Sequence, residues 1–163
     1  MPDQVDRLVA AWRRERPDLD VEPLEVLSRV SRLARHLQLA RHEAFGRLAL
    51  PQSHFDVLAA LRRSGPPYEM TPGELMAETL VSSGTMTHRV DQMEAAGLVS
   101  RQPDAADGRV VRVRLLPKGL RAVDSALANL LERERKLLMN LTVAEQARVA
   151  RLLRRLLEPF DQA

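Results

Sequence analysis

The sequence predicts a mostly α-helical fold with a small β-hairpin. Three observations between residues 70 and 119 lead to this prediction. A helix start lies at residue 71, a second helix covers residues 82–95, and two β-type segments joined by a turn precede a further helix that begins at residue 117. Two helices followed by a hairpin, in this order, are typical of a winged helix-turn-helix.

The two helices of this region are predicted from their caps and their apolar spacing. Thr71 and Glu74 form a capping box, and Pro72 occupies the first helical position, where its missing N–H costs nothing. Ser82 is a candidate cap for the next helix, and Gly97 follows its end. The apolar residues of that second helix recur at one-turn spacing, so we expect them on one buried face. They are Met86, Val90 and Met93.

The hairpin is predicted over Leu98–Arg101 and Val110–Leu115, with a turn at the Pro, Asp and Gly residues between them. Its arginines alternate with apolar residues. They are Arg101, Arg109, Arg112 and Arg114. A basic side chain at the tip of such a hairpin suits phosphates or a narrow minor groove, so the hairpin favours double-stranded DNA as a partner.

The face of the second helix opposite its buried residues is small and polar, which also favours DNA. Together with the hairpin it gives the expected DNA-binding residues. They are Ser82, Ser83, Gly84, Thr85, Thr87, His88, Arg101, Arg109 and Arg112. Arg89 lies about 60° from the buried direction by the helical repeat, so we expect an inward, flank-facing contact for it. The alternative to DNA binding, from another class of function, is a winged-helix dimer that acts through protein–protein contacts.

The flanking segments are predicted to be helical and to form a dimer. Helices are expected within residues 1–16, 23–45, 52–63, 118–140 and 142–160. The terminal helices carry more Leu and Val than the core of one chain of this size needs, so we expect a homodimer. The residues concerned are Leu8, Val9, Leu127, Leu130, Leu131, Leu138, Leu141, Val149, Leu152, Leu153, Leu156 and Leu157. Residues 1–163 are predicted to form a single domain, with dimerisation helices in 1–50 and 117–163 and the DNA-binding region in 51–116.

Composition excludes several other classes of function. The chain has no cysteine, so disulfides and thiol chemistry are absent, and its net charge of +3 is only mildly basic. It has no signal-peptide layout and no apolar run of membrane-spanning length, so we expect a cytoplasmic protein without a membrane partner. There is no Gly-rich phosphate loop, nucleophile elbow or paired catalytic carboxylate, which argues against an enzyme. The four histidines lack metal-ligand spacing, so no metal or other cofactor is predicted.

The segment MTHRVDQMEAAGLVSRQPDAADGRVVRVRLLPKG, residues 86–119, resembles the recognition helix and wing of the MarR family of dimeric transcription regulators, and the resemblance extends over essentially the whole chain. In that family an Asp-x-Arg motif holds an arginine for insertion into the minor groove, which implies DNA-binding roles for Asp107 and Arg109. Gly108 stands where arginine is frequent in the family. The resemblance also implies a two-fold dimer that reads a pseudo-palindromic operator.

An N-terminal helix with a tryptophan, followed later by FDVLAALRRSGPPY, is similar to the urate-responsive subgroup of this family. The resemblance implies a ligand-binding set of Trp12, Asp56, Arg63 and Arg89. In the subgroup an anionic purine binds the Trp and the first Arg, and its charge disturbs the pairing of the Asp with the recognition-helix Arg. The implied function is a repressor released from its operator by urate or a similar small anion.

Each of these four residues also has a purely structural explanation. Trp12 is suited to anchoring the first helix, Asp56 suits the beginning of a helix, and Arg63 suits the last turn of one. Arginine at the position of Arg89 is widespread in the broad family. Other small anions fit two arginines and an aromatic ring as well, and a DNA-binding regulator without small-molecule control remains open.

Overall fold

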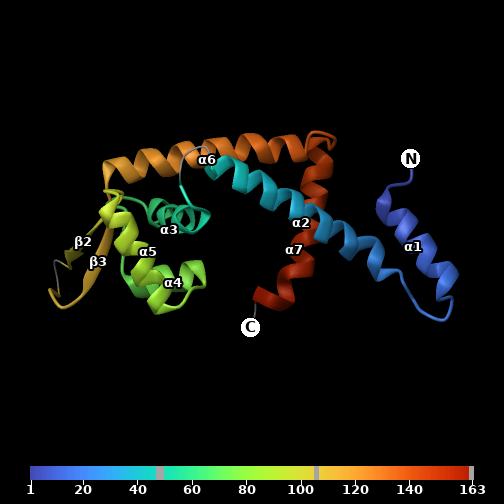
Figure 1. The fold of residues 1–163 in the computed structure, drawn as a ribbon, viewed down its shortest axis with the longest axis horizontal. Helices are drawn as coiled ribbons and strands as arrows, with labels where there is room; N and C mark the ends of the chain where they lie inside the picture. Colours follow the sequence, from blue (N-terminus) through green and yellow to red (C-terminus); the bar gives the residue numbers. More distant parts are fainter. Residues whose placement is uncertain (47–49, 105–106, 162–163) are drawn as a thin grey trace. The chain divides into compact units, whose positions relative to one another are not determined.

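The computed structural model describes residues 1–46, 50–104 and 107–161 and is dominated by helices (Figure 1). In chain order the elements are α1 (Gln4–Glu15), α2 (Pro23–Gly46), α3 (Gln52–Arg63), β1 (Glu69–Met70), α4 (Pro72–Thr79), α5 (Ser83–Ala95), β2 (Val99–Pro103), β3 (Val111–Leu115), α6 (Pro117–Leu137) and α7 (Val143–Asp161). The predicted fold class, mostly α with a small β-wing, is confirmed. The described contacts form two compact units, Met1–His42 and Glu43–Ala163, and each is described by itself.

The N-terminal unit is a pair of helices with a small apolar core. Asp3 begins α1 through a capping box in which its side chain accepts hydrogen bonds from the backbone of Val5 and Asp6. Val5 and Val9 are buried against Val21, and Leu24 packs on this cluster. Val9 is therefore a core residue of its own chain. Its predicted place in a dimer surface was wrong, because its side chain is fully covered within the unit.

The core of the second unit lies among α3, α4, α5, α6 and the sheet, and it fixes the orientation of α5 (Figure 1). Met86, Val90 and Met93 are fully buried, as their spacing predicted. They pack in one apolar cluster with Leu58 of α3 and Leu75 of α4, among others. Since one side of α5 is held in the core, the opposite side is presented outward.

A three-stranded antiparallel sheet in the order β1-β3-β2 adjoins these helices. β2 and β3 form the predicted hairpin, with Arg101 opposite Val113. β2 runs two residues further than expected and ends at Pro103. β1 was not predicted from the sequence, since a strand of two residues has no alternation to detect.

The connection between α4 and α5 differs in detail from the prediction. The capping box of α4 is confirmed, because Thr71 Oγ1 accepts from the Glu74 backbone N–H at 3.2 Å and Glu74 Oε2 accepts from the Thr71 N–H at 2.7 Å. Ser82 is the N-cap residue of α5, but its side chain makes no capping hydrogen bond. Its hydroxyl lies 3.0 Å from the Thr85 hydroxyl instead. The Ser82 side chain therefore does not cap the first turn of α5.

The C-terminal helices leave much of their apolar surface uncovered. α6 ends at Leu137, three residues earlier than predicted, and the predicted capping box of Thr142 and Glu145 begins α7. None of the described residues of α7 is buried. Leu130 on α6 is an exception to the predicted dimer surface, because it is buried in the core of its own chain. Exposed members of that surface are Leu127, Leu131, Leu138, Val149, Leu152, Leu153, Leu156 and Leu157.

The start of α6 packs so closely on the segment after α5 that it requires a glycine. A Cβ atom on Gly119 would lie 2.1 Å from the Leu98 carbonyl oxygen and 2.9 Å from Leu115 Cδ1. We expect Gly119→Ala to lower the free energy of unfolding by about 2 kcal/mol or more, because backbone atoms must move. Denaturant unfolding of Gly119→Ala and of Gly84→Ala, which meets no atom within 4 Å, measures this. Equal stability of the two variants would contradict the close packing.

Candidate nucleic-acid interface

The outward face of α5 is made of small polar side chains around a helix N-terminus. Most of the residues predicted to contact DNA lie here and all of these are exposed: Ser82, Ser83, Gly84, Thr85, Thr87 and His88. Gly84 has open space around it, so a ligand backbone can approach closely. The first backbone N–H groups of a helix carry partial positive charge and donate hydrogen bonds to phosphate oxygens. This face has the shape and chemistry of a groove-reading helix.

A chain of hydrogen bonds joins this face to α3. His54 Nε2 lies 3.0 Å from Gln92 Oε1, and Gln92 Nε2 lies 3.0 Å from His88 Nε2. Because the Gln92 amide offers one donor end and one acceptor end, it can bridge the two imidazole rings. The network holds the His88 ring over α5, and its other nitrogen, Nδ1, is available to an incoming partner.

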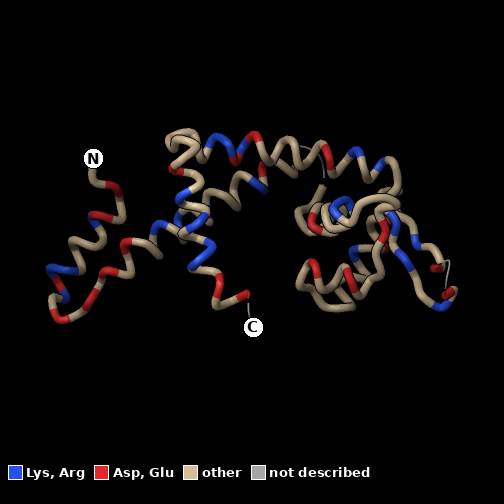
Figure 2. The backbone as a smooth tube through the Cα atoms, turned by 180° about the vertical axis from the view of Figure 1, so that it is seen from behind, with Lys and Arg blue, Asp and Glu red and all other residues tan. Residues whose placement is uncertain are grey.

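The arginines of the wing, which is the hairpin of β2 and β3 with the described residues of its turn, are each paired with a carboxylate. Arg112 bonds to Asp104, and Arg114 lies 3.9 Å from Glu69. Figure 2 accordingly shows both signs of charge along the hairpin. Acidic neighbours therefore compensate most of the positive charge of the predicted arginines.

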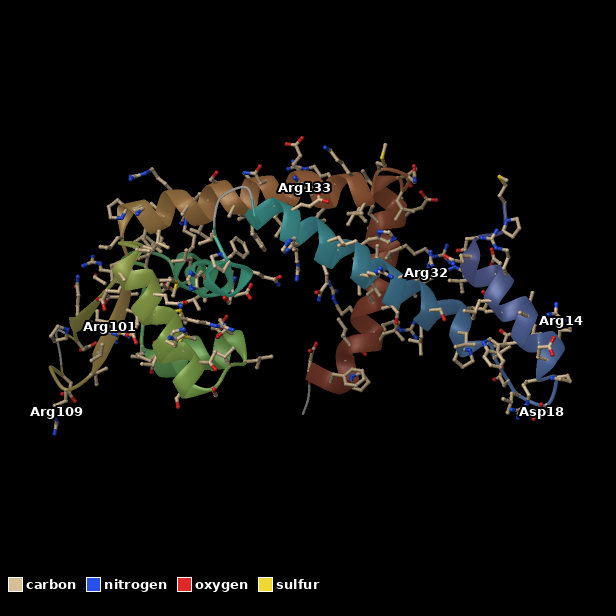
Figure 3. The ribbon with its side chains drawn as sticks, viewed as in Figure 1. Arg14, Asp18, Arg32, Arg101, Arg109 and Arg133 are labelled. Atoms are coloured by element: carbon tan, nitrogen blue, oxygen red, sulfur yellow. The ribbon has the colours of Figure 1, made fainter. Side chains whose placement is uncertain are left out.

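Arg109 differs from the other wing arginines because it stands at the exposed tip of the hairpin (Figure 3). Its side chain is 92% exposed. Asp107 Oδ1 accepts from the Arg109 backbone N–H at 3.1 Å and from its Nε at 3.2 Å. The carboxylate therefore orients the guanidinium without covering it. Nη1 and Nη2 remain available to phosphates or base edges.

Arg101 clamps the wing to α5 rather than facing solvent. Its Nη1 donates to Glu94 Oε2 at 2.7 Å, and its Nη2 donates to Asp91 Oδ1 at 2.6 Å. The Arg101 backbone N–H also donates to Glu94 Oε1 at 2.8 Å. A guanidinium that already binds two carboxylates has few donors left for DNA. We infer that Arg101 positions the wing against α5, the candidate DNA-recognition helix.

The clamp also affects the titration of its acid partner. The Arg101 backbone N–H and then its guanidinium lower the pKa of the Glu94 carboxyl. A lowered pKa in the folded state means that this contribution to stability is present above the pKa of the unfolded carboxyl. It is lost as the pH falls through the lower folded value. The clamp is thus intact at neutral pH.

The predicted ligand-binding residues fall in both units. Asp56 and Arg63 lie on α3, two turns apart, and Arg63 Nη2 donates to Glu78 Oε2 of α4 at 3.3 Å. Arg89 is half-buried on α5, as its helical position predicted, and makes no hydrogen bond within the described part of the chain. Trp12 lies on α1 in the other unit and is 47% exposed.

Two contributors to the interface were missed from the sequence. Glu94 anchors Arg101, and His54 holds Gln92 from a different helix. Glu94 precedes Arg101 by seven residues across a helix end, so no helical or strand period links them. His54 and Gln92 are separated by 38 residues. Such partners follow from tertiary packing, for which a single sequence gives no signal.

Neither a metal centre nor a membrane span is found among the described residues. No group of three or more His, Asp or Glu side chains in that part of the chain is placed to hold a metal ion. None of the helices found there is both long and apolar enough to cross a membrane.

The fold and this surface define a winged helix-turn-helix DNA-binding protein, and comparison with known proteins gives its family. A profile of the MarR family matches residues 50–110. The chain is 34% identical to the HTH-type transcriptional regulator PecS of Dickeya dadantii (strain 3937), over 93% of this chain and 92% of that protein. The chain therefore belongs to the MarR family of transcriptional regulators, which are not enzymes.

Solved structures agree with this assignment. A MarR family protein from Bacillus stearothermophilus superimposes with a TM-score of 0.74 at 27% identity, covering 88% of this chain and 99% of that one. BpsR of Bordetella bronchiseptica, whose DNA binding is regulated by 6-hydroxynicotinic acid, shares the fold with a TM-score of 0.65. It is 24% identical and covers 80% of this chain and 91% of its own. Some members of the family thus respond to small molecules.

The exposed tip of the wing gives the first prediction for DNA binding. Arg109→Ala is expected to weaken DNA binding and to reduce the slope of log affinity against log salt by about 0.9 for each phosphate that the variant no longer neutralises. Fluorescence anisotropy at several salt concentrations measures both. Arg62→Ala removes an equal charge from a residue paired with Asp124 on α6 and serves as the control. Identical slopes for the two variants would refute the role of the wing tip.

The contacts of Arg101 with Glu94 lead to a prediction for DNA affinity that is opposite in sign to the one from charge repulsion between Glu94 and DNA. Glu94→Ala removes a negative charge near the expected DNA surface, yet we expect weaker DNA binding, because Arg101 is deprived of an anchor and the wing is no longer held. Glu132→Ala on α6 removes the same charge elsewhere and is expected to bind as the wild type does. Tighter DNA binding by Glu94→Ala would show that Arg101 contacts DNA directly.

Proposed function

We propose that the protein is a homodimeric repressor that binds a pseudo-palindromic operator and is released from it by urate or a similar small anion. The outward polar face of α5, with Arg109 oriented at the wing tip by Asp107, is the observation that carries the proposal. A recognition helix of this kind enters the major groove, and a wing arginine suits the adjacent minor groove.

The dimer is supported by apolar surface that the described part of the chain leaves uncovered. Leu152 and Leu156 lie one turn apart on α7, and both are exposed. Burial of a leucine side chain stabilises a protein by roughly 2 kcal/mol. MarR-family proteins bind DNA as dimers, and a two-fold dimer would place its recognition helices about 34 Å apart, one turn of DNA.

Release by an anion is supported by the way α3 adjoins α5. α3 carries Asp56 and Arg63, and it packs directly on the helix that carries Arg89. The pair of Arg63 and Glu78 is exposed on both sides, and exposed pairs contribute at most about 1 kcal/mol. An anionic ligand can therefore replace Glu78 at small cost. Negative charge brought to Arg63 would then act on Asp56 and shift α5 through Arg89.

Gel-shift titration of the full-length protein on DNA from upstream of its own gene, with and without urate, tests the proposal. Specific binding that urate reverses is the expected result. Specific binding that urate and other small anions leave unchanged would remove the small-molecule control. Absence of specific binding, or an affinity independent of salt, would favour protein partners instead, because phosphate neutralisation always makes DNA binding salt-dependent.

Variants of α3 separate the steps of the proposed release. Arg63→Ala should bind operator DNA normally but need at least several-fold more urate for release, because it lacks the charge that attracts the anion. Asp56→Asn should bind the ligand without releasing DNA, because the repelled charge is gone. Gel shifts with increasing urate measure both, and a wild-type dose curve for Asp56→Asn would exclude the electrostatic mechanism.

A further inference from the structure

The side chain of Asp104 connects the two sides of the wing just beyond the end of β2. Its Oδ1 accepts a hydrogen bond from the Asp107 backbone N–H at 3.1 Å, and its Oδ2 accepts one from Arg112 Nε on β3. The backbone closes the same turn, because the Asp104 N–H donates to the Val110 carbonyl oxygen at 2.8 Å. The Asp104 side chain is only 12% exposed. Asp104 therefore joins the strand β3 to Asp107.

Arg112, which binds Asp104, also lies near acidic residues of β1 and α4. The hydrogen bond to Asp104 is the main cause that raises the pKa of the Arg112 guanidinium, and the nearby charges of Glu69 and Glu74 raise it further. Glu69 belongs to β1, and Glu74 lies in the first turn of α4, where it closes the capping box. Carboxylates of the same chain thus compensate the positive charge of Arg112. This arginine links the turn of the wing to the beginning of α4.

Arg109 depends on this arrangement, because among the described residues only Asp107 binds its side chain. That side chain is 92% exposed, and Asp107 Oδ1 accepts from its Nε and from its backbone N–H. Asp107 is held in turn by the bond from its own N–H to Asp104. Loss of the Asp104 carboxylate would allow Asp107 and the Arg109 guanidinium to take several directions. An arginine that must first be ordered binds a phosphate or a base edge less tightly.

We propose that Asp104 and Arg112 position Arg109 for contact with DNA, and that Arg112 itself does not contact DNA. The series of bonds from Arg112 through Asp104 and Asp107 to Arg109 carries the proposal. It rests on the proposed function, because it takes Arg109 as a DNA contact. It gives Arg112 a role different from the direct DNA contact that we expect from the sequence.

A double-mutant cycle separates positioning from a direct electrostatic effect. Asp104→Ala removes a negative charge from the wing, so charge alone predicts tighter DNA binding. We expect instead that DNA binding weakens about threefold or more, and that the same substitution weakens it no further in the Arg109→Ala background. Fluorescence anisotropy of the full-length protein with DNA from upstream of its gene measures the affinities of the cycle. Tighter binding by Asp104→Ala, or an equal loss in both backgrounds, would overturn the proposal.

Arg112→Gln tests whether Arg112 acts through Arg109 or on phosphates directly. A lost phosphate contact would reduce the slope of log affinity against log salt by about 0.9 even in the Arg109→Ala background. We expect weaker binding in the wild-type background only, and a double variant whose slope equals that of Arg109→Ala. Arg114→Gln is the matched control, because Arg114 lies on the same strand but pairs with Glu69. A further decrease in the slope of the double variant would show that Arg112 contacts DNA and would refute its positioning role.

A measurement without DNA distinguishes this proposal from the proposed function. In nitrogen-15 NMR spectra of the wild type, the Arg112 Nε–H is expected to exchange slowly with water, because it is bonded to Asp104 and the Arg112 side chain is only 32% exposed. The signal that is missing from Arg112→Gln identifies it, and Asp104→Asn is expected to accelerate its exchange severalfold. Circular dichroism confirms that each variant is folded.

The NMR and DNA-binding results together show which idea fails. Fast exchange of the Arg112 Nε–H in a wild-type protein that binds DNA would overturn the positioning role alone. A protected Arg112 Nε–H in a protein without DNA affinity would refute the proposed function, and with it the role of the pair of Asp104 and Arg112.

Discussion

The position of the recognition helix relative to the wing depends on the guanidinium of Arg101. This group binds Asp91 and Glu94, which both lie on α5, while its own backbone belongs to β2. The inner face of α5 fixes the rotation of the helix through Met86, Val90 and Met93. The clamp then fixes where the wing stands. In the proposed complex, a helix in the major groove and a hairpin at the neighbouring minor groove would have to keep a constant separation, and this network of ion pairs would maintain it.

The pairing of arginines with carboxylates bears on how a protein of net charge +3 would bind DNA selectively. A hairpin with four free arginines would attract any duplex, because phosphate contacts carry no sequence information. Here Arg101, Arg112 and Arg114 face carboxylates, and Arg109 stands exposed at the tip. The uncovered positive charge of the wing is thus concentrated at its tip, and in the proposed complex sequence reading would fall to the polar face of α5.

Much of the fold could be predicted because its signals are local. The capping box of Thr71 and Glu74 begins α4, and the one-turn spacing of Met86, Val90 and Met93 gives the buried face of α5. The outward residues of α5 follow from the same geometry. What could not be predicted is pairing between elements. The strand β1, the bond of His54 to Gln92 and the anchoring of Arg101 by Glu94 depend on how helices and strands pack, and no period in the sequence reports it.

The predicted dimer surface was also wrong at individual positions, because an apolar side chain can be buried within its own chain instead of between two chains. Val9 and Leu130 resemble the other leucines and valines of the terminal helices, yet the chain covers both itself. The leucines of α7 have no such cover among the described residues. A helix none of whose described residues is fully buried gains less stability from its own chain, because most helical stability in proteins comes from packing the apolar face. If a second copy covers α7, the spacing of two recognition helices and the folding of that helix depend on the same apolar contact, so DNA binding and dimerisation cannot be varied independently.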